Sequence, residues 1–281
     1  MKKKYLIVNA DDFGLDEKVN EGIIEAYQRG IVTSTSILAN GSAFEHGVGL
    51  LKDNPGLGVG VHLALVAGRP LGKWQTIAAD GEFYPDYHSF FRRYLTGRIS
   101  LQEIKEEWRL QIKKVQQSGL RLTHLDSHQH LHLVPGILKI VLELADEFAI
   151  SCLRCPRETQ LAAGIPSVFR LIARSGLSLL SSYARPFIKQ KCITTDDFLG
   201  MLWGGSMSEE KLKTVLSNMT LKGTTELMVH PGVDDRYLKE KTGWDYHWEE
   251  EKNALVSAEI IRLLKKLQVS LINYGDLPDA D

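Results

Sequence analysis

Short apolar segments alternate with amphipathic segments along most of the 281-residue chain. The first apolar run, Tyr5–Ala10, is nearly continuous, as in buried parallel strands, and the stretch Asp16–Arg29 behind it has apolar residues at helical spacing. This unit recurs roughly eight times, which predicts an α/β fold with a (β/α) barrel resembling a TIM barrel. We expect strands at Tyr5–Ala10, Ile31–Ala39, Gly58–Leu65, a segment leading into His124, Ser151–Cys155, Cys192–Thr195, Glu226–Val229 and Val269–Asn273. The main helices are expected at Asp16–Arg29, Ser42–Lys52, Ser100–Ser118, Ile137–Phe148, Met207–Met219 and Trp248–Leu267.

Two regions interrupt this rhythm. Residues 67–99 are rich in Gly, Pro and aromatic side chains, and residues 159–190 are apolar and basic by turns. The first is too long for a plain connection and is expected to be a lid or binding loop. Alternatively, it packs its aromatic residues against the body or against a second subunit, which leaves a homodimer open. We predict one domain over residues 1–281, with a distorted or incomplete barrel.

Composition excludes several classes of protein. A hydrophobic fraction of 43% suits one large soluble domain, and a net charge of -1 gives no basic field for nucleic acid. The apolar run after the first lysines stops at Asn9, too early for an export segment, and no stretch is long enough to span a membrane. Cys152, Cys155 and Cys192 do not form a disulfide framework. We therefore expect a cytoplasmic protein.

Ionisable residues cluster where the predicted strands end. In a (β/α) barrel these ends meet at one rim, which carries the active site. The residues expected at this rim are Asp11, Asp12, His62, Asp126, His128, Arg154, Arg157, Glu158, Asp196, Asp197 and His230. Scattered surface charges would not follow the strand ends so regularly.

A metal site is the chemistry that these residues favour. Four of the nine histidines lie within His124–His132, and neutral imidazole is a common metal ligand. If the strand continues through this stretch, alternate side chains share one face. The alternative is a polar loop whose histidines only cap the next helix.

The pair Asp11–Asp12 offers two roles. One carboxylate can bind a metal while the other takes a proton from water, although the pair could instead cap the helix at Asp16. His62 is a ligand candidate or a core histidine, and His230 is held extended by Pro231. One Asp with two His also occurs in non-haem iron oxygenases, but a second carboxylate beside the metal favours hydrolysis.

Four motifs resemble those of the YdjC-like carbohydrate deacetylases, which include chitooligosaccharide and hopanoid-biosynthesis-associated deacetylases. The motifs are Asn9–Gly14, Gly60–Leu63, Thr123–His132 and Val229–Pro231, in that order. The resemblance implies a (β/α)-barrel-like fold and metal-dependent hydrolysis of an N-acetyl group on a sugar.

The resemblance also implies roles for single residues. Asp12, His62 and His128 would hold a divalent ion, Mg²⁺ or Zn²⁺. Asp11 would be the general base, and His230 would protonate the leaving amine or stabilise the oxyanion. The residues expected to orient the ligands or contact the substrate are Asp126, Arg154 and Glu158.

Other functions compete with this interpretation. Arg154 and Arg157 suit a metal-dependent hydrolase of another bond, such as a phosphoester. A sugar-binding protein without catalysis is a third class. Apolar and basic residues at 170–189 could contact a membrane and admit a lipid-linked amino sugar, or could form amphipathic helices packed on the barrel.

Overall fold

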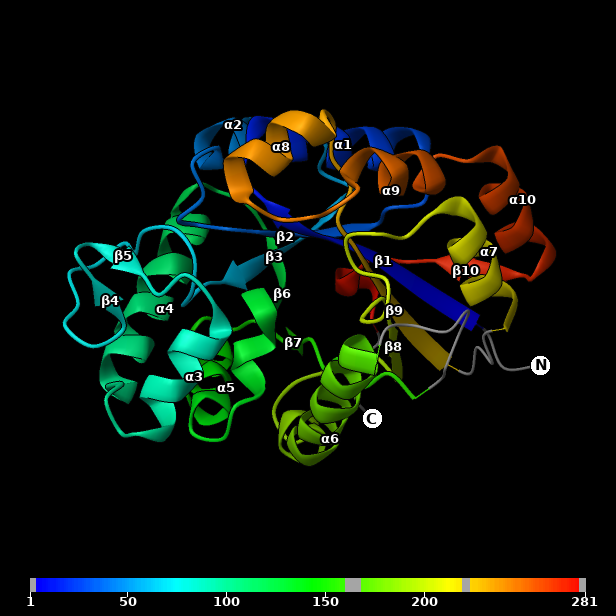
Figure 1. Ribbon diagram of the computed structural model, residues 1–281. Coiled ribbons are helices and arrows are strands. Elements are labelled where there is room, and N and C mark those ends of the chain that lie inside the picture. The colour runs from blue at the N-terminus through cyan, green and yellow to red at the C-terminus, as the bar shows by residue number, and fades with distance from the viewer. Residues whose placement is uncertain (1–3, 160–167, 219–222, 278–281) are drawn as a thin grey trace.

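A curled, fully parallel sheet ringed by helices forms the body of the protein (Figure 1). The computed structural model describes residues 4–159, 168–218 and 223–277. The strands follow the order β7-β6-β3-β2-β1-β9-β8, and β10 pairs with the first residues of β1. Their bounds are Lys4–Phe13 (β1), Ser34–Ile37 (β2), Gly58–Leu63 (β3), Leu122–Ser127 (β6), Cys152–Leu153 (β7), Asp197–Leu199 (β8), Gly223–Val229 (β9) and Val269–Leu271 (β10).

The two edge strands of this order, β7 and β8, are linked by the chain segment that runs from Ile193 into β8. Leu153 N–H donates to the Ile193 carbonyl at 3.0 Å, and Ile193 N–H donates to the Ser151 carbonyl at 2.8 Å. A few residues later the same segment becomes β8 and pairs with β9. The predicted (β/α)-barrel-like fold is confirmed, and its distortion lies at this irregular junction.

Helices surround the sheet and bury their apolar residues against it or against neighbouring helices. Their bounds are Glu17–Arg29 (α1), Phe44–Asp53 (α2), Tyr87–Leu95 (α3), Leu101–Gln117 (α4), Ile137–Glu147 (α5), Val168–Lys189 (α6), Glu209–Asn218 (α7), Asp235–Thr242 (α8), Trp248–Leu255 (α9) and Ala258–Lys266 (α10). Short 3₁₀ segments lie at His128–Leu133 (η1) and Tyr274–Asp276 (η2). No helix in the described parts of the chain is long and apolar enough to cross a membrane.

The region 67–99 has more structure than a plain loop. It contains the antiparallel hairpin of β4 (Ala78–Ala79) and β5 (Glu82–Phe83), followed by α3. Buried Glu107 of α4 holds the start of this region, because its carboxylate accepts hydrogen bonds from the backbone of Leu71 and Gly72 and from the Trp74 indole. In the second predicted insertion, α6 occupies residues 168–189, and residues 160–167 lie outside the described part.

Two predicted elements are wrong in detail, and one helix was missed. The sixth strand is Asp197–Leu199 rather than Cys192–Thr195, so Asp196 and Asp197 lie at its start and not at the rim. The predicted final helix is two helices, because Ser257 caps α10 by accepting a hydrogen bond from Glu259 N–H. Helix α8 was not predicted at all. The predicted end of the helix at Met219 lies outside the described residues.

Candidate metal centre and active site

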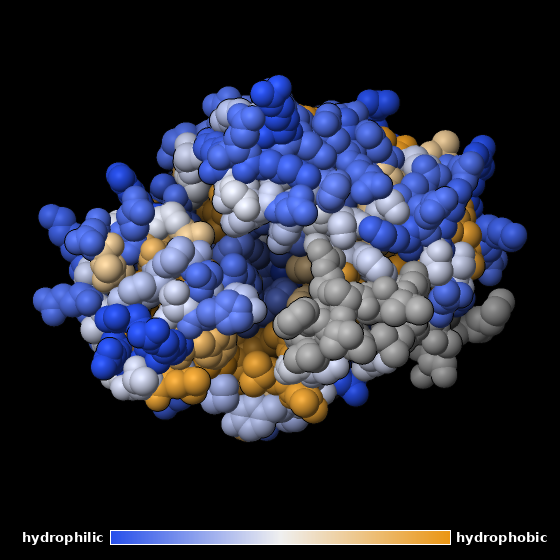
Figure 2. Space-filling model, in the orientation of Figure 1, coloured by the Kyte–Doolittle hydropathy of each residue, from blue (hydrophilic) through white to orange (hydrophobic). Residues whose placement is uncertain are grey.

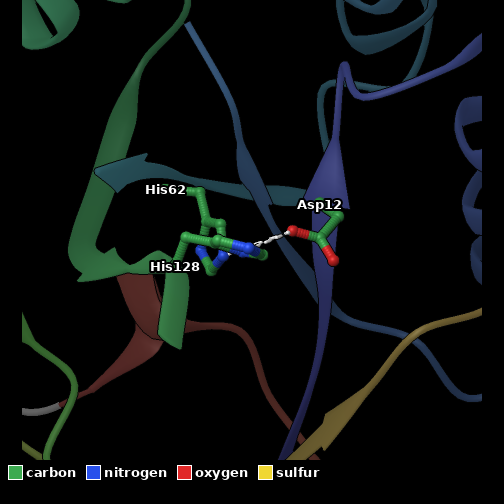
Figure 3. A group of neighbouring side chains, drawn as sticks. All are labelled: Asp12, His62 and His128. Atoms are coloured by element: carbon green, nitrogen blue, oxygen red, sulfur yellow. Dashed lines mark ion pairs between the residues drawn. The ribbon is translucent and has the colours of Figure 1, made fainter. Parts of the chain in front are cut away.

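Three side chains from distant parts of the chain converge at the rim of the barrel (Figure 3). Asp12 comes from the end of β1, His62 from the end of β3 and His128 from the first residue of η1. Asp12 Oδ1 lies 3.4 Å from His62 Nε2 and 3.2 Å from His128 Nδ1. The three potential ligand atoms all lie within 4.8 Å of one another, and all three residues are buried.

Backbone geometry directs Asp12 towards the two imidazoles. Asp12 has a positive φ of 68°, an uncommon conformation for a residue other than glycine. The pairing of β1 with β2 shifts register between Ala10 and Phe13, so the strand is irregular at this point. As a result, the neighbouring carboxylates of Asp11 and Asp12 have different partners.

The donor set fits a divalent metal ion. Asp12 Oδ1 is buried and accepts no hydrogen bond within the described structure, although it faces two imidazole nitrogens. Burial alone would raise the pKa of Asp12, but the charges of His128, His62 and His230 hold it below its ordinary value. A buried, ionised oxygen beside two nitrogen donors is a combination that a metal ion satisfies.

Asp126 fixes the orientation of His62. Its Oδ1 lies 2.9 Å from His62 Nδ1, which leaves Nε2 to face Asp12. Its Oδ2 accepts hydrogen bonds from Ser36 Oγ at 2.8 Å and pairs with Arg154 at 2.7 Å. Burial alone would lower the pKa of His62, but Asp126, followed by Asp11 and Asp12, raises it to about 9. This is the arrangement in which a carboxylate positions a ligand imidazole.

Arg154 is fully buried and pairs with three carboxylates. It donates to both oxygens of Asp11 at 2.7 Å and also pairs with Asp126 and Glu226. Glu226 in turn accepts a hydrogen bond from the Tyr274 hydroxyl, and burial raises the pKa of Glu226 to about 7. The sequence interpretation missed Glu226 and Tyr274. The one signal in the sequence was for Glu226, because a glutamate inside the apolar strand β9 needs a buried partner.

The histidine-rich stretch does not continue as a strand. It becomes η1 at His128, so the expected alternation of side chains ends at Ser127. His124 stacks on Tyr274, with ring centroids 3.9 Å apart. His132 bridges Ser127 Oγ and the Arg154 carbonyl. Burial lowers the pKa of His124 to about 3 and that of His132 to about 4, so both are neutral structural groups at pH 7.

A cavity of about 620 Å³ opens above these residues. Its polar lining includes Asp11, His62, His128 and His230. Trp244 lies on one side, with its ring 5.4 Å from the His128 ring and nearly parallel to it. Apolar side chains of the lining include Phe91 of α3, Leu177 and Leu180 of α6, Leu131 and Val134. Figure 2 shows the hollow at the centre of this face, with apolar side chains along its lower edge.

Two expected site residues have different surroundings. Glu158 does not line this cavity, and its Oε1 accepts a hydrogen bond from Gly200 N–H at 3.2 Å. Arg154 is 0% exposed, so it acts on the carboxylates behind the cavity rather than on a bound ligand. His230, by contrast, directly follows β9 and lines the cavity, with its ring 5.1 Å from the Tyr246 ring.

Comparison with known proteins gives consistent matches over nearly the whole chain. Residues 5–266 match the family model described as YdjC-like protein. A protein of Brevibacillus brevis named carbohydrate deacetylase is 34% identical over 274 residues, covering 97% of this chain and 99% of the relative. A carbohydrate deacetylase of Clostridium beijerinckii is 32% identical over 275 residues, with the same coverage.

Solved structures agree on the fold. A protein of Enterococcus faecalis V583, proposed to take part in cellobiose-phosphate cleavage, has a TM-score of 0.79 and 26% identity, covering 97% of this chain and 98% of that protein. An uncharacterised protein of Agrobacterium tumefaciens C58 has a TM-score of 0.55 and 10% identity, covering 99% and 90%. The second likeness concerns the fold alone.

Proposed function

The chain belongs to the YdjC-like protein family, and from that premise we propose that it is a metal-dependent hydrolase that removes the acetyl group from an N-acetylated amino sugar. The observation that carries this proposal is the convergence of Asp12, His62 and His128 beside Asp11 at the floor of a cavity. Relatives that match over nearly their full length are named carbohydrate deacetylases, which supports the same activity.

In the proposed mechanism, Asp12, His62 and His128 would hold one divalent ion. When bound, such an ion polarises a carbonyl oxygen and lowers the pKa of water. Asp11 accepts the proton of the attacking water. Arg154 donates to both of its oxygens and so fixes the carboxylate plane. Asp11 Oδ1 also accepts a hydrogen bond from Asn9 Nδ2, so the second lone pair of Oδ2 is the site left for the proton.

His230 completes the proposed chemistry. It faces the cavity from the end of β9, where its imidazole can give a proton to the leaving nitrogen and so release the free amino sugar with acetate. Asp126 holds His62 in the orientation that points Nε2 towards Asp12. The ring faces of Trp244 and Tyr246 offer an apolar surface for the sugar.

The ion is proposed to be Mg²⁺ or Zn²⁺. Two imidazoles and one carboxylate favour Zn²⁺, because Mg²⁺ prefers oxygen ligands. Three protein ligands also leave positions open for water and substrate, as in catalytic zinc sites. Titration of chelated protein with each ion, followed by acetate release, would separate the two.

A phosphoester hydrolase is the second candidate, since one similar structure is associated with cellobiose-phosphate cleavage. Arg154 does not support it, because this guanidinium is fully buried and already paired with Asp11, Asp126 and Glu226. The test is one panel of N-acetylated and phosphorylated sugars, assayed for acetate and phosphate with and without chelator. We expect chelator-sensitive acetate release; phosphate release alone would refute the proposal.

A further inference from the structure

A buried carboxylate outside the metal centre holds the segment that carries His230. Glu251, in the first turn of α9, is 0% exposed. Its Oε2 accepts a hydrogen bond from His230 N–H at 2.6 Å, and its Oε1 accepts one from Met207 N–H at 2.8 Å. One side chain therefore joins the end of β9 to the loop that precedes α7.

The same helix turn secures the chain on the other side of His230. Gly232 N–H donates to the Trp248 carbonyl at 3.2 Å. Pro231, between His230 and Gly232, has no N–H to donate. A Cβ added to Gly232 would come within 3.0 Å of Trp248 Cβ, so the two segments are in close contact. The backbone on both sides of Pro231 is thus tied to α9.

The aromatic residues that line one side of the cavity are held by the same part of the chain. His247 N–H donates to the Gly205 carbonyl at 2.8 Å, and a Cβ added to Gly205 would come within 2.3 Å of the Tyr246 ring. The Tyr246 ring lies 5.3 Å from the Trp248 ring and 5.1 Å from the His230 ring. In the described hydrogen bonds, Glu251 contacts the backbone of His230 and Met207 and none of the metal-ligand candidates.

From this arrangement we infer that Glu251 is a positioning residue that sets the placement of His230 for proton donation. The inference rests on the proposed deacetylase function. Glu251 does not line the cavity; its carboxylate binds the backbone N–H groups of His230 and Met207, and a carboxylate can accept several hydrogen bonds at once. Burial raises the pKa of Glu251, and the charge and backbone N–H of His230 oppose that rise.

A double-mutant cycle tests this role. Glu251→Gln is compared with the unmodified chain, and the double variant with His230→Ala alone. We expect Glu251→Gln to lower kcat by on the order of 10- to 100-fold with little change in KM, because misplacing a catalytic group reduces the rate of the chemical step. In the His230→Ala background, the same change should alter kcat by less than about 2-fold.

Controls separate this inference from the proposed function. Glu250→Gln changes an exposed neighbour in the same helix turn and should leave kcat unchanged. Metal content of every variant should match that of the unmodified protein, because the ligands lie on β1, β3 and η1. If Glu251→Gln does not fold, Glu251→Asp takes its place in the cycle, because it keeps the charge but shortens the reach.

The outcomes are distinct. Equal losses of kcat in both backgrounds would overturn the inference and leave the deacetylase proposal standing. A chain that is inactive on the whole acetylated panel before any substitution would overturn both.

Discussion

Asp11 and Asp12 are neighbours in sequence with different partners in space. Asp12 Oδ1 faces His62 and His128, whereas both oxygens of Asp11 accept hydrogen bonds from Arg154. The residue pattern allowed two roles for the pair, and only the resemblance to the YdjC-like deacetylases implied which residue has which. The positive φ of Asp12 separates them, and no periodicity rule predicts that conformation.

Replacing Asp11 tests the division of roles. Asp11→Asn removes the proposed proton acceptor and keeps the size of the side chain, so acetate release should fall by about 10²- to 10⁴-fold. Metal content should stay at the level of the unmodified protein. Asp80→Asn, at an exposed hairpin position, is the matched control. A metal-loaded Asp11→Asn protein that still works at the full rate would show that Asp11 is not the base.

The pKa of His62 predicts how metal binding depends on pH. In the metal-free protein Asp126, Asp11 and Asp12 outweigh burial and raise this pKa from 6.5 to about 9. At pH 7 an incoming ion must therefore displace a proton, since neutral imidazole is the ligand form. Apparent affinity should rise by about tenfold per pH unit up to pH 9 and then level off.

Titration calorimetry at several pH values measures this dependence. The raised pKa of His62 also stabilises the metal-free fold below pH 6.5, and that stabilisation is lost as the pH rises through 9. Affinity that stays constant between pH 7 and pH 9 would mean that His62 is already neutral in the free site.

Among the elements, strongly periodic helices were predicted to within a residue or two, whereas the bounds of several short strands were not. Helix α4 begins and ends within a residue of its expected bounds, because Ser100 caps it and its apolar residues repeat regularly. Strand β8 was misplaced because Asp197–Leu199 is only three residues long. The segment just before it, Cys192–Thr195, has residues that also favour a strand, and the prediction chose that segment. The break between α9 and α10 could have been predicted from Ser257, which caps α10. It was missed because the helical spacing of apolar residues continues on both sides of Ser257.

Gly60 in β3 gives a test of packing beside the site. A Cβ at this position would come within 2.4 Å of the His124 ring, which is buried and stacked on Tyr274. Gly60→Ala should therefore reduce the free energy of unfolding by about 1–3 kcal/mol.

Urea denaturation measures this change. Gly49→Ala is the matched control, because nothing lies within 4 Å of a Cβ there and the position is in α2. Gly49→Ala should raise the free energy of unfolding by about 0.5–1 kcal/mol. Equal stability of the two variants would show that the His124 ring yields to the added methyl group.

On the scale of the whole molecule, the curl of the sheet creates the site. β1 and β3 are not adjacent, because β2 lies between them, yet Asp12 and His62 come within 3.4 Å. The sequence predicted that ionisable residues share one rim, since parallel strands all end there. It gave no means of finding Tyr274 and Glu251, and for Glu226 only the signal of a glutamate inside an apolar strand, because the roles of all three depend on contacts between distant segments.

Anomalous diffraction from crystals grown with Zn²⁺ tests the central claim most directly. We predict one strong peak per chain, about 2.0–2.2 Å from Asp12 Oδ1, His62 Nε2 and His128 Nδ1. A map without a peak at this position, or with an ion that one of these three residues does not contact, would contradict the account.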